Sequence, residues 1–479
     1  MADVSGAITP ASCRRCLSPT AVVVHDAIQE DTVQQDGAPT MDGMAVRIQF
    51  LNKSILRFPS NLRRIAADKD YIAPRTVALG PYYHGLRKLQ AMEEVKRTAV
   101  GFFFQGLAAA AAGAAAESRE SAYQKMVPIA RQVRGWYADA AGIATHDDDA
   151  FTTMMFVDGC FLVQFIGTML RKGVEETAAA SPLRSMIQPH LLGIMRDMML
   201  LENQIPWPVM EFFMRLQGLQ TKHIIALLVS WGLEGRVWRD SQEPLSLVDI
   251  DERYTPSHLL CLIRFYKVGS ACGSGGGGGR RRRRRNGEEG ISGKAVPIST
   301  SAAELAEMGI KLRAREKTTK LSDMNLIKGP LFATLSLPPL YVDSLAANWL
   351  VNMAAFEMCT EASSTDEYAV NSYLSVLSLL MNQENDVREL RVKHIVHGFF
   401  GDEETLEFFK SLTPILYLDG QAYLRIIVDL EAYRQKRRAW IAVYSFLYNN
   451  AKTIATVLSI VGVLVGIFKA LYSLKKQQM

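Results

Sequence analysis

Apolar residues recur along most of this chain at the three- and four-residue spacing that is typical of amphipathic helices. The segments that we expect to be helical are residues 86–105, 121–141, 341–359, 366–381, 384–396, 402–412 and 423–448. The last of these reads as one long helix. Residues 151–170 are strongly apolar and contain a single acid, Asp158, which would need a partner if it is buried. Most of the body is therefore expected to be helical.

Prolines and alternating residues interrupt this helical pattern. In residues 194–213 we expect Met198, Leu201 and Ile205 to share one helical face. Pro206 and Pro208 would then break and restart the helix. Residues 310–315 alternate between apolar and polar, which predicts a strand, and residues 325–327 and 331–337 flank a turn and predict a hairpin. The expected fold class is mainly α, with a multi-helix globular body, a small β-hairpin element and one C-terminal transmembrane helix.

The last apolar run, residues 453–468, differs from all the others because it is long, uncharged and apolar on every side. Its ~16 residues would form a helix of roughly 24 Å, which is slightly short for a bilayer. Lys469 can snorkel toward the headgroups, so the residues after it extend the span. We therefore predict a membrane span rather than a buried core helix, formed by Thr453, Ile454, Val457, Leu458, Ile460, Val461, Val463, Leu464, Val465, Ile467 and Phe468.

The flanks of this run agree with a membrane span. Trp440, Tyr444 and Tyr448 precede it and Tyr472 follows it, where interfacial aromatic residues are expected. The N-terminus lacks the basic and apolar regions of a secretory signal. We therefore expect a tail-anchored, single-pass protein whose body faces the cytosol, and the basic residues before the span agree with that orientation.

Changes in composition divide the chain into five parts. Residues 1–44 are expected to be a disordered leader, 45–268 the helical N-terminal half of a domain, and 269–297 a linker rich in glycine and arginine. Residues 298–436 would be the C-terminal half of the same domain, with the small β element. Residues 437–479 would form a membrane-proximal helix and the anchor.

The net charge of +5 comes from one run of six arginines in the linker, and the remainder sums to −1. The body is therefore near neutral, and nucleic acid is an unlikely partner for it. The run itself is either a low-complexity insertion without a role or a site for anionic lipid, RNA or nuclear import. Its residues are Arg280, Arg281, Arg282, Arg283, Arg284 and Arg285.

Few residues suggest chemistry. His84 has no catalytic partner at a known spacing, and we expect a structural histidine that is hydrogen-bonded to backbone. Glu202, Asn203 and Gln204 stand at the helix break, where free backbone groups need partners. The sequence lacks GxSxG, HExxH, a phosphate loop and a Rossmann glycine pattern. A hydrolase or transferase using His84, Glu202 or Asp158 remains the alternative to a protein without catalytic residues, cofactor or metal.

The cysteines do not alter this interpretation. Cys160, Cys261 and Cys359 lie in apolar surroundings and read as small buried hydrophobes, while Cys13 and Cys16 form a lone CxxC pair. Six cysteines in a chain of 479 residues do not indicate a disulfide framework.

Several motifs, in their order and spacing, resemble the plant domain-of-unknown-function-247 family. They include Ala78-Leu-Gly-Pro-Tyr-Tyr-His-Gly85, Met155-Phe-Val-Asp-Gly-Cys-Phe-Leu162, Asp197-Met-Met-Leu-Leu-Glu-Asn-Gln-Ile-Pro206 and Leu337-Pro-Pro-Leu-Tyr-Val-Asp343. The resemblance implies a plant protein with a C-terminal span and no established enzymatic activity. Some grass members are associated with pollen–stigma self-incompatibility, which implies recognition.

The chain departs from the family pattern at Tyr83, where a second histidine is usual, and at His397-Gly398, which replaces an asparagine-containing turn. The departure at Tyr83 argues against a catalytic or metal-binding pair with His84. The expected function is an interaction or recognition module presented at a membrane, with the bilayer and an unidentified protein as partners.

Overall fold

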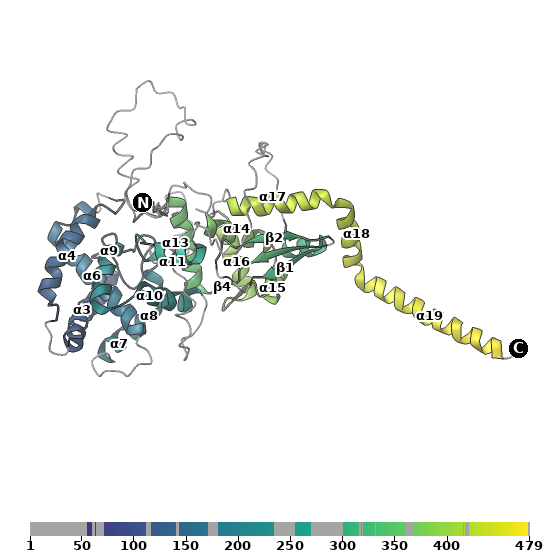
Figure 1. The fold of residues 1–479 in the computed structure, drawn as a ribbon, viewed down its shortest axis with the longest axis horizontal. Helices are drawn as coiled ribbons and strands as arrows, with labels where there is room; N and C mark the ends of the chain where they lie inside the picture. The colour runs from purple at the N-terminus through teal and green to yellow at the C-terminus, as the bar shows by residue number, and fades with distance from the viewer. Residues whose placement is uncertain are drawn as a thin grey trace, which may run out of the picture.

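The computed structural model (Figure 1) describes residues 55–59, 63, 71–111, 116–139, 143–170, 181–233, 254–269, 300–315, 318, 320–330, 332–360, 368–414, 416 and 421–477. The predicted leader, residues 1–44, lies outside the described residues. So do the predicted linker from residue 270 onward, including Arg280–Arg285, and the pair Cys13 and Cys16. The domain boundaries placed in those segments stay predictions.

The N-terminal half is built around α6 (Asp148–Leu170), which packs against α3 (Gln90–Ala110), α4 (Arg119–Arg134) and α9 (Trp207–Gln217). A short 3₁₀ turn, η1 (Arg87–Leu89), precedes α3. Close packing of α6 on α9 depends on Gly159, since a Cβ atom there would lie 2.6 Å from Cγ1 of Val209. The predicted helix 121–141 ends earlier, at Arg134.

Further helical elements continue the core in both halves. They are α7 (Ser181–Ile187), η2 (Gln188–His190), α8 (Leu191–Asp197), α10 (Thr221–Leu228), η3 (Val229–Leu233), α11 (Leu259–Val268) and α13 (Ser344–Cys359). Although α13 comes late in the chain, it packs on α8 and α11, and Nε1 of Trp349 donates to the Met195 carbonyl at 3.0 Å. Both halves thus share one core.

The break in residues 194–213 is longer than predicted. α8 ends at Asp197, and residues 198–206 are non-helical before α9 begins at Trp207, with Pro208 in its first turn, where proline is tolerated. The expectation that Met198, Leu201 and Ile205 share one helical face is therefore wrong. The polar side chains that follow α8 bond to this irregular backbone and hold it out of a helix.

The predicted hairpin is confirmed as β2 (Asn325–Lys328) and β3 (Ala333–Leu337), which pair antiparallel with Lys328 opposite Ala333. β1 (Ile310–Ala314) joins them parallel to β3, after the short helix α12 (Ala302–Glu307). The Ser301 hydroxyl caps α12 by accepting from the Glu304 amide at 3.2 Å, as expected for a serine that precedes a helix.

A second, two-stranded sheet was not predicted. It pairs β4 (Leu340–Val342) in parallel with β5 (Val396–Gly398). As a result α13 begins only at Ser344, and the predicted helix 384–396 is shortened to α15 (Glu384–Val392). His394, at φ 56°, lies in the left-handed region and ends the helical path. The strand then forms because its partner comes from elsewhere in the chain.

The last helices are α14 (Ala369–Leu380), α16 (Asp402–Leu412), α17 (Gln421–Lys436), α18 (Arg438–Asn449) and α19 (Ala451–Gln477). The single helix predicted for residues 423–448 is wrong, because the chain bends at Arg437 (φ −126°, ψ 22°). It bends again at Asn450, and α19 then projects away from the body (Figure 1). The fold is mainly helical with a few short strands, as predicted.

Candidate functional site

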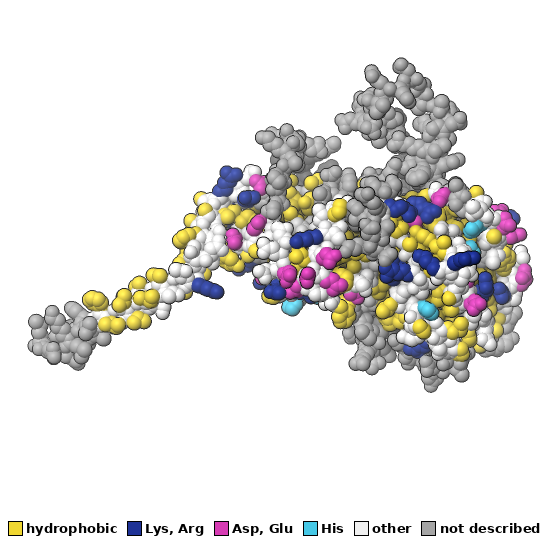
Figure 2. All heavy atoms as spheres, turned by 180° about the vertical axis from the view of Figure 1, so that it is seen from behind, with side chains coloured by type: hydrophobic (Ala, Val, Ile, Leu, Met, Phe, Trp, Pro, Cys, Tyr) yellow, Lys and Arg dark blue, Asp and Glu magenta, His cyan; other side chains and the backbone are white. Residues whose placement is uncertain are grey.

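The candidate membrane span, α19, makes no buried contact with the body. Its segment Ala451–Lys469 is long and apolar enough to cross a bilayer, and none of it is buried. Val457 and Leu464 are each 53% exposed and Ile467 is 51% exposed. Figure 2 shows apolar side chains along this projecting arm. The helix thus presents to its surroundings the kind of surface that soluble proteins place in their cores.

α6 shows what a core helix of similar composition looks like. It passes the same test of length and composition, but 78% of its apolar segment is buried inside the body. α6 is therefore the central core helix of the N-terminal half, whereas α19 has no protein surface against it among the described residues.

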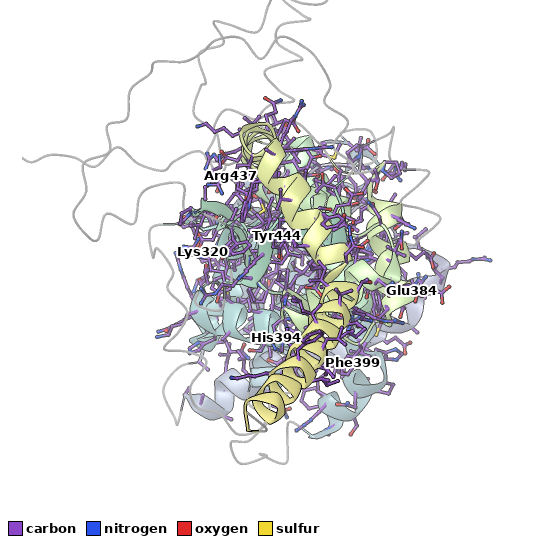
Figure 3. All side chains as sticks on the ribbon, turned by 90° about the vertical axis from the view of Figure 1, so that its right-hand side faces the viewer. Lys320, Glu384, His394, Phe399, Arg437 and Tyr444 are labelled. Atoms are coloured by element: carbon purple, nitrogen blue, oxygen red, sulfur yellow. The ribbon has the colours of Figure 1, made fainter. Side chains whose placement is uncertain are left out.

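Three contacts join α17 and α18, the helices before α19, to the hairpin. The Arg437 guanidinium donates to the carbonyls of Pro330 at 2.7 Å and Gly329 at 3.0 Å. Lys328 forms an ion pair with Asp429 of α17 at 2.7 Å. Figure 3 shows Arg437 at the start of α18 and Tyr444 further along it, where the helix crosses the end of the body.

The third contact is aromatic. The ring of Tyr444 on α18 meets that of Phe332, beside the hairpin, at 5.4 Å between centroids and an interplanar angle of 72°. This edge-on arrangement is one that aromatic pairs prefer. Gly309 lies beside this pair, since a Cβ atom there would be 3.3 Å from the Phe332 ring and in ordinary contact, at 3.5 Å, with the Tyr444 ring. The candidate span is thus connected to the body through fixed helices.

Asp158 has a partner that the sequence did not reveal. Its carboxylate contacts Nζ of the fully buried Lys96 at 2.6 Å and accepts from the Gly80 amide at 2.8 Å, while Glu93 lies 2.6 Å from the same ammonium. Burial opposes the charge on Lys96, but the two carboxylates together raise its pKa. Burial also raises the pKa of Asp158, against the attraction of Lys96. This cluster joins α3, α6 and the Gly80 turn.

Glu202 is enclosed by donors. Its fully buried carboxylate accepts from the Phe58 amide at 2.8 Å, the Tyr83 hydroxyl at 2.7 Å and Arg57 at 3.0 Å, and it also pairs with Arg63. Burial, and next the Glu202 charge, raise the pKa of Tyr83. Tyr83 thus serves as a donor to a structural carboxylate.

Asn203 and Gln204 satisfy free backbone groups at the break, as predicted. Asn203 accepts from the Leu79 amide at 2.8 Å and donates to the Val77 and Asp197 carbonyls at 3.0 and 2.9 Å. Gln204 donates to two carbonyls of the irregular segment and accepts from the Leu260 amide at 3.0 Å. These amides hold the chain around Leu79 and α11 against the end of α8.

His84 is exposed, and its ring packs edge-on against His146 at 5.7 Å between centroids. Among the described residues no hydrogen bond reaches its imidazole, so the predicted backbone hydrogen bond is not found. Nor does any hydrogen bond of the described part of the chain join two of His84, Glu202 and Asp158. In the described ranges no three His, Cys, Asp or Glu side chains gather where they could hold a metal ion.

The described cysteines behave as apolar core residues. Cys160 and Cys261 are buried and unbridged, and Cys359 is partly buried. Burial raises the pKa of the Cys160 thiol, and burial together with the Glu202 charge raises the pKa of Cys359 to about 12. Thiols of this kind are poor nucleophiles at neutral pH.

Sequence reasoning missed Lys96 and Arg437, and of these two only Lys96 had a signal in the sequence. Lys96 lies among Met92, Val95 and Ala99 on the apolar face of α3, and a charge on such a face is a readable signal of a buried ion pair. Arg437 gave no signal, because it sits in a run of helix-forming residues with no glycine or proline.

Comparison with known proteins gives a consistent result. The model of the domain-of-unknown-function-247 family, described as plant protein of unknown function, matches residues 55–465. A UPF0481 protein of Arabidopsis thaliana is similar, with 28% identity over 375 residues that cover 75% of this chain and 72% of the relative. No solved structure matches this chain.

Proposed function

Since this chain belongs to the plant domain-of-unknown-function-247 family, for which no activity is described, we propose its function from its architecture: a membrane-anchored interaction or recognition protein. The observation that supports the anchor is the apolar segment Ala451–Lys469 of α19, none of which is buried. Each central Leu, Ile, Val or Phe favours membrane insertion by about 0.3–0.6 kcal/mol, and the segment holds many of them without an acid. Water offers this surface no comparable stabilisation.

The proposed role of the body is to present a surface to partners at that membrane. Confinement to a membrane raises the effective concentration of the body toward proteins in the same membrane, so even weak contacts gain occupancy. The buried charges described above support a non-catalytic body, because each acid named in the enzyme alternative is already paired with donors. The fixed connection through α17 and α18 would hold the body in one orientation.

Charge placed in α19 tests the anchor. In the full-length protein, Val457→Arg with Leu464→Arg should release most of the protein from membranes during alkaline carbonate extraction, since each arginine costs about 2.5–3.5 kcal/mol at mid-span. The matched control, Val457→Leu with Leu464→Val, keeps the segment apolar and should remain with the membrane. Retention of the arginine variant would contradict the anchor, as would release of the wild type.

A second variant tests the arginine run as the source of membrane retention. Replacing Arg280–Arg285 by glutamine should leave carbonate-resistant retention unchanged, because the span supplies it. If this replacement released the protein, the linker would hold it at the membrane, and the anchor proposal would be wrong.

Proximity labelling in plant cells tests recognition. The full-length protein should label a set of membrane neighbours that an unrelated soluble protein fused to residues 437–479 does not label. Replacing residues 451–479 by an unrelated span from the same membrane should preserve that set. If the body labelled nothing beyond what the span alone labels, the interaction function would be contradicted while the anchor stood.

A further inference from the structure

α18 has two faces, and only one of them contacts protein. The inner face, with Ile441, Tyr444 and Ser445 half-buried, packs on α12 and the hairpin. The outer face is exposed and apolar, with Val443 54%, Phe446 64% and Leu447 48% exposed, and Ala439 and Ala442 beside them. Nothing in the described part of the chain covers this outer face.

The position of α18 limits what can cover it. Its last residue, Asn449, is separated from α19 by Asn450 alone. α18 has 12 residues and is therefore about 18 Å long. No part of it can lie far from the surface where α19 would enter a bilayer. The chain bends at Asn450, and α18 is therefore not a simple continuation of the span (Figure 1).

The charges around α18 favour contact with an anionic surface. From residue 432 to residue 479 the sequence holds eight basic side chains and no acidic one. Arg434 and Lys436 are exposed in the last turn of α17, Arg438 is exposed at the start of α18, and Lys452 is exposed just after it. Arg434 and Arg438 also line an open cleft of about 580 Å³, but that cleft contains the acid Glu431 and the inner-face residues Ile441 and Ser445, so the preference for an anionic surface rests on the exposed basic residues alone. Lipid phosphates would find basic groups at both ends of the apolar face.

We propose that α18 is an interfacial helix whose outer face lies in the headgroup layer of an anionic bilayer. This inference rests on the proposed anchor and adds a lipid-binding surface to it. Val443, Phe446 and Leu447 enter the boundary between headgroups and acyl chains, and the arginines at the start of the helix contact lipid phosphates. Because the inner face of α18 packs on the hairpin, contact of the outer face with lipid fixes the orientation of the body relative to the membrane.

Trp440 is a native reporter of this contact. It is half-buried on α18, one turn from Val443 and two turns from Leu447, on a side of the helix that these residues share. The full-length protein is reconstituted in vesicles of phosphatidylcholine with phosphatidylserine, with and without bromine on the acyl chains near the headgroups. The Trp440 signal, taken as wild type minus Trp440→Phe, should lose about half its intensity to the brominated lipid.

Two variants test which face of α18 contacts the lipid, and one change of lipid composition tests whether that contact depends on anionic headgroups. Val443→Glu with Phe446→Glu should abolish the quenching of Trp440 and leave carbonate-resistant insertion intact. The control, Met186→Glu with Leu192→Glu, alters exposed apolar residues of α7 and α8 in the other half and should change neither. Vesicles of phosphatidylcholine alone should quench Trp440 less than the anionic vesicles do.

Each result bears on the proposal. An unquenched Trp440 in the wild type overturns it, as expected if a second copy or another protein covered the outer face. Equal quenching in the glutamate variant overturns the assignment of that face, and equal quenching without phosphatidylserine overturns the role of the basic residues. Carbonate extraction reports on α19 alone, so failure of the anchor is distinguishable from failure of α18.

Discussion

Two buried acids of the N-terminal half, Glu202 and Asp158, are held by residues that lie far from them in the sequence. Glu202 accepts hydrogen bonds from donors that come 119 and 144 residues earlier, and Asp158 meets Lys96 across 62 residues. A sequence pattern could show that a buried acid needs partners, but it could not name them, because the partners are chosen by how α3, α6 and the irregular segments pack.

Glutamine in place of Glu202 removes the charge and keeps the volume. We expect the free energy of unfolding to fall by about 2 kcal/mol. Breaking a fully buried ion pair destabilises a protein by more than this. The loss is smaller here because the side chains of Arg57 and Arg63 are 34% and 43% exposed, so water can solvate their charges when Glu202 is neutralised. Denaturant unfolding in detergent measures this. Glu211→Gln is the control, since its pair with Arg215 is exposed, and an exposed pair of this kind contributes about 0.5 kcal/mol or less. Equal losses would contradict the structural role of Glu202.

Tyr71 should make the protein sensitive to alkali. Burial, and next the charge of Glu407, raise its pKa to about 12. Below pH 10 the phenol is neutral in both states, whereas above pH 10 the unfolded chain loses the proton first. Stability is therefore lost as the pH rises toward 12, by about 1.4 kcal/mol per pH unit. Between pH 9 and 11.5 the wild type should lose about 2 kcal/mol more than Tyr71→Phe. An identical pH dependence of the two would contradict this.

Among the elements, those set by local pattern were predictable, and those set by distant pairing were not. The hairpin β2–β3 has a glycine-proline turn between two apolar runs, so the residues that specify it are neighbours. β4 and β5 are very short strands that pair across a long stretch of chain, and neither would be stable alone. The bend at Arg437 was hidden because its cause is a hydrogen bond to the hairpin rather than a local residue preference.

The packing of α6 on α9 gives a prediction with a matched control. In Gly159→Ala the added methyl would lie 2.6 Å from Val209 and 3.2 Å from Phe213. Overpacking of this kind should lower the free energy of unfolding by about 1–3 kcal/mol. Gly101→Ala is the same substitution in α3, where no atom lies within 4 Å of the new Cβ. It should raise stability by about 0.5–1 kcal/mol. Changes of the same sign in thermal unfolding would contradict the close approach of α6 and α9.

The corner between α17 and α18 can be tested at Arg437. Arg437→Ala removes two hydrogen bonds to the hairpin carbonyls. Amide exchange in α18 should therefore accelerate roughly fivefold, which corresponds to about 1 kcal/mol. The neighbouring Arg438 is exposed, and Arg438→Ala in the same detergent should leave exchange nearly unchanged. If both variants exchanged alike, Arg437 would not hold the corner.

In the whole molecule the helices around α6 lie at one end and the hairpin with the C-terminal helices at the other (Figure 1). The body and α19 should therefore be thermodynamically separate, since no part of the apolar segment Ala451–Lys469 is buried. Deleting residues 451–479 should leave the melting temperature of the body within about 2 °C. Deleting residues 438–479 should lower it further, because Ile441 and Tyr444 no longer cover α12 and Phe332. Thermal unfolding of both truncated proteins is followed by near-UV circular dichroism. Equal changes in melting temperature would contradict the separation of α19, but not α18, from the body.

The aspartate within α6 has a consequence for biosynthesis. The helix leaves the ribosome before α9 and α13 exist to cover it, and its length and composition would suit insertion into a bilayer. A carboxylate at mid-helix makes that route unfavourable by about 2.5–3.5 kcal/mol. Lys96 has already been synthesised by then and can pair with Asp158 as the nascent chain collapses. We therefore expect the same carboxylate that organises the core to disfavour insertion of α6 into a membrane during synthesis.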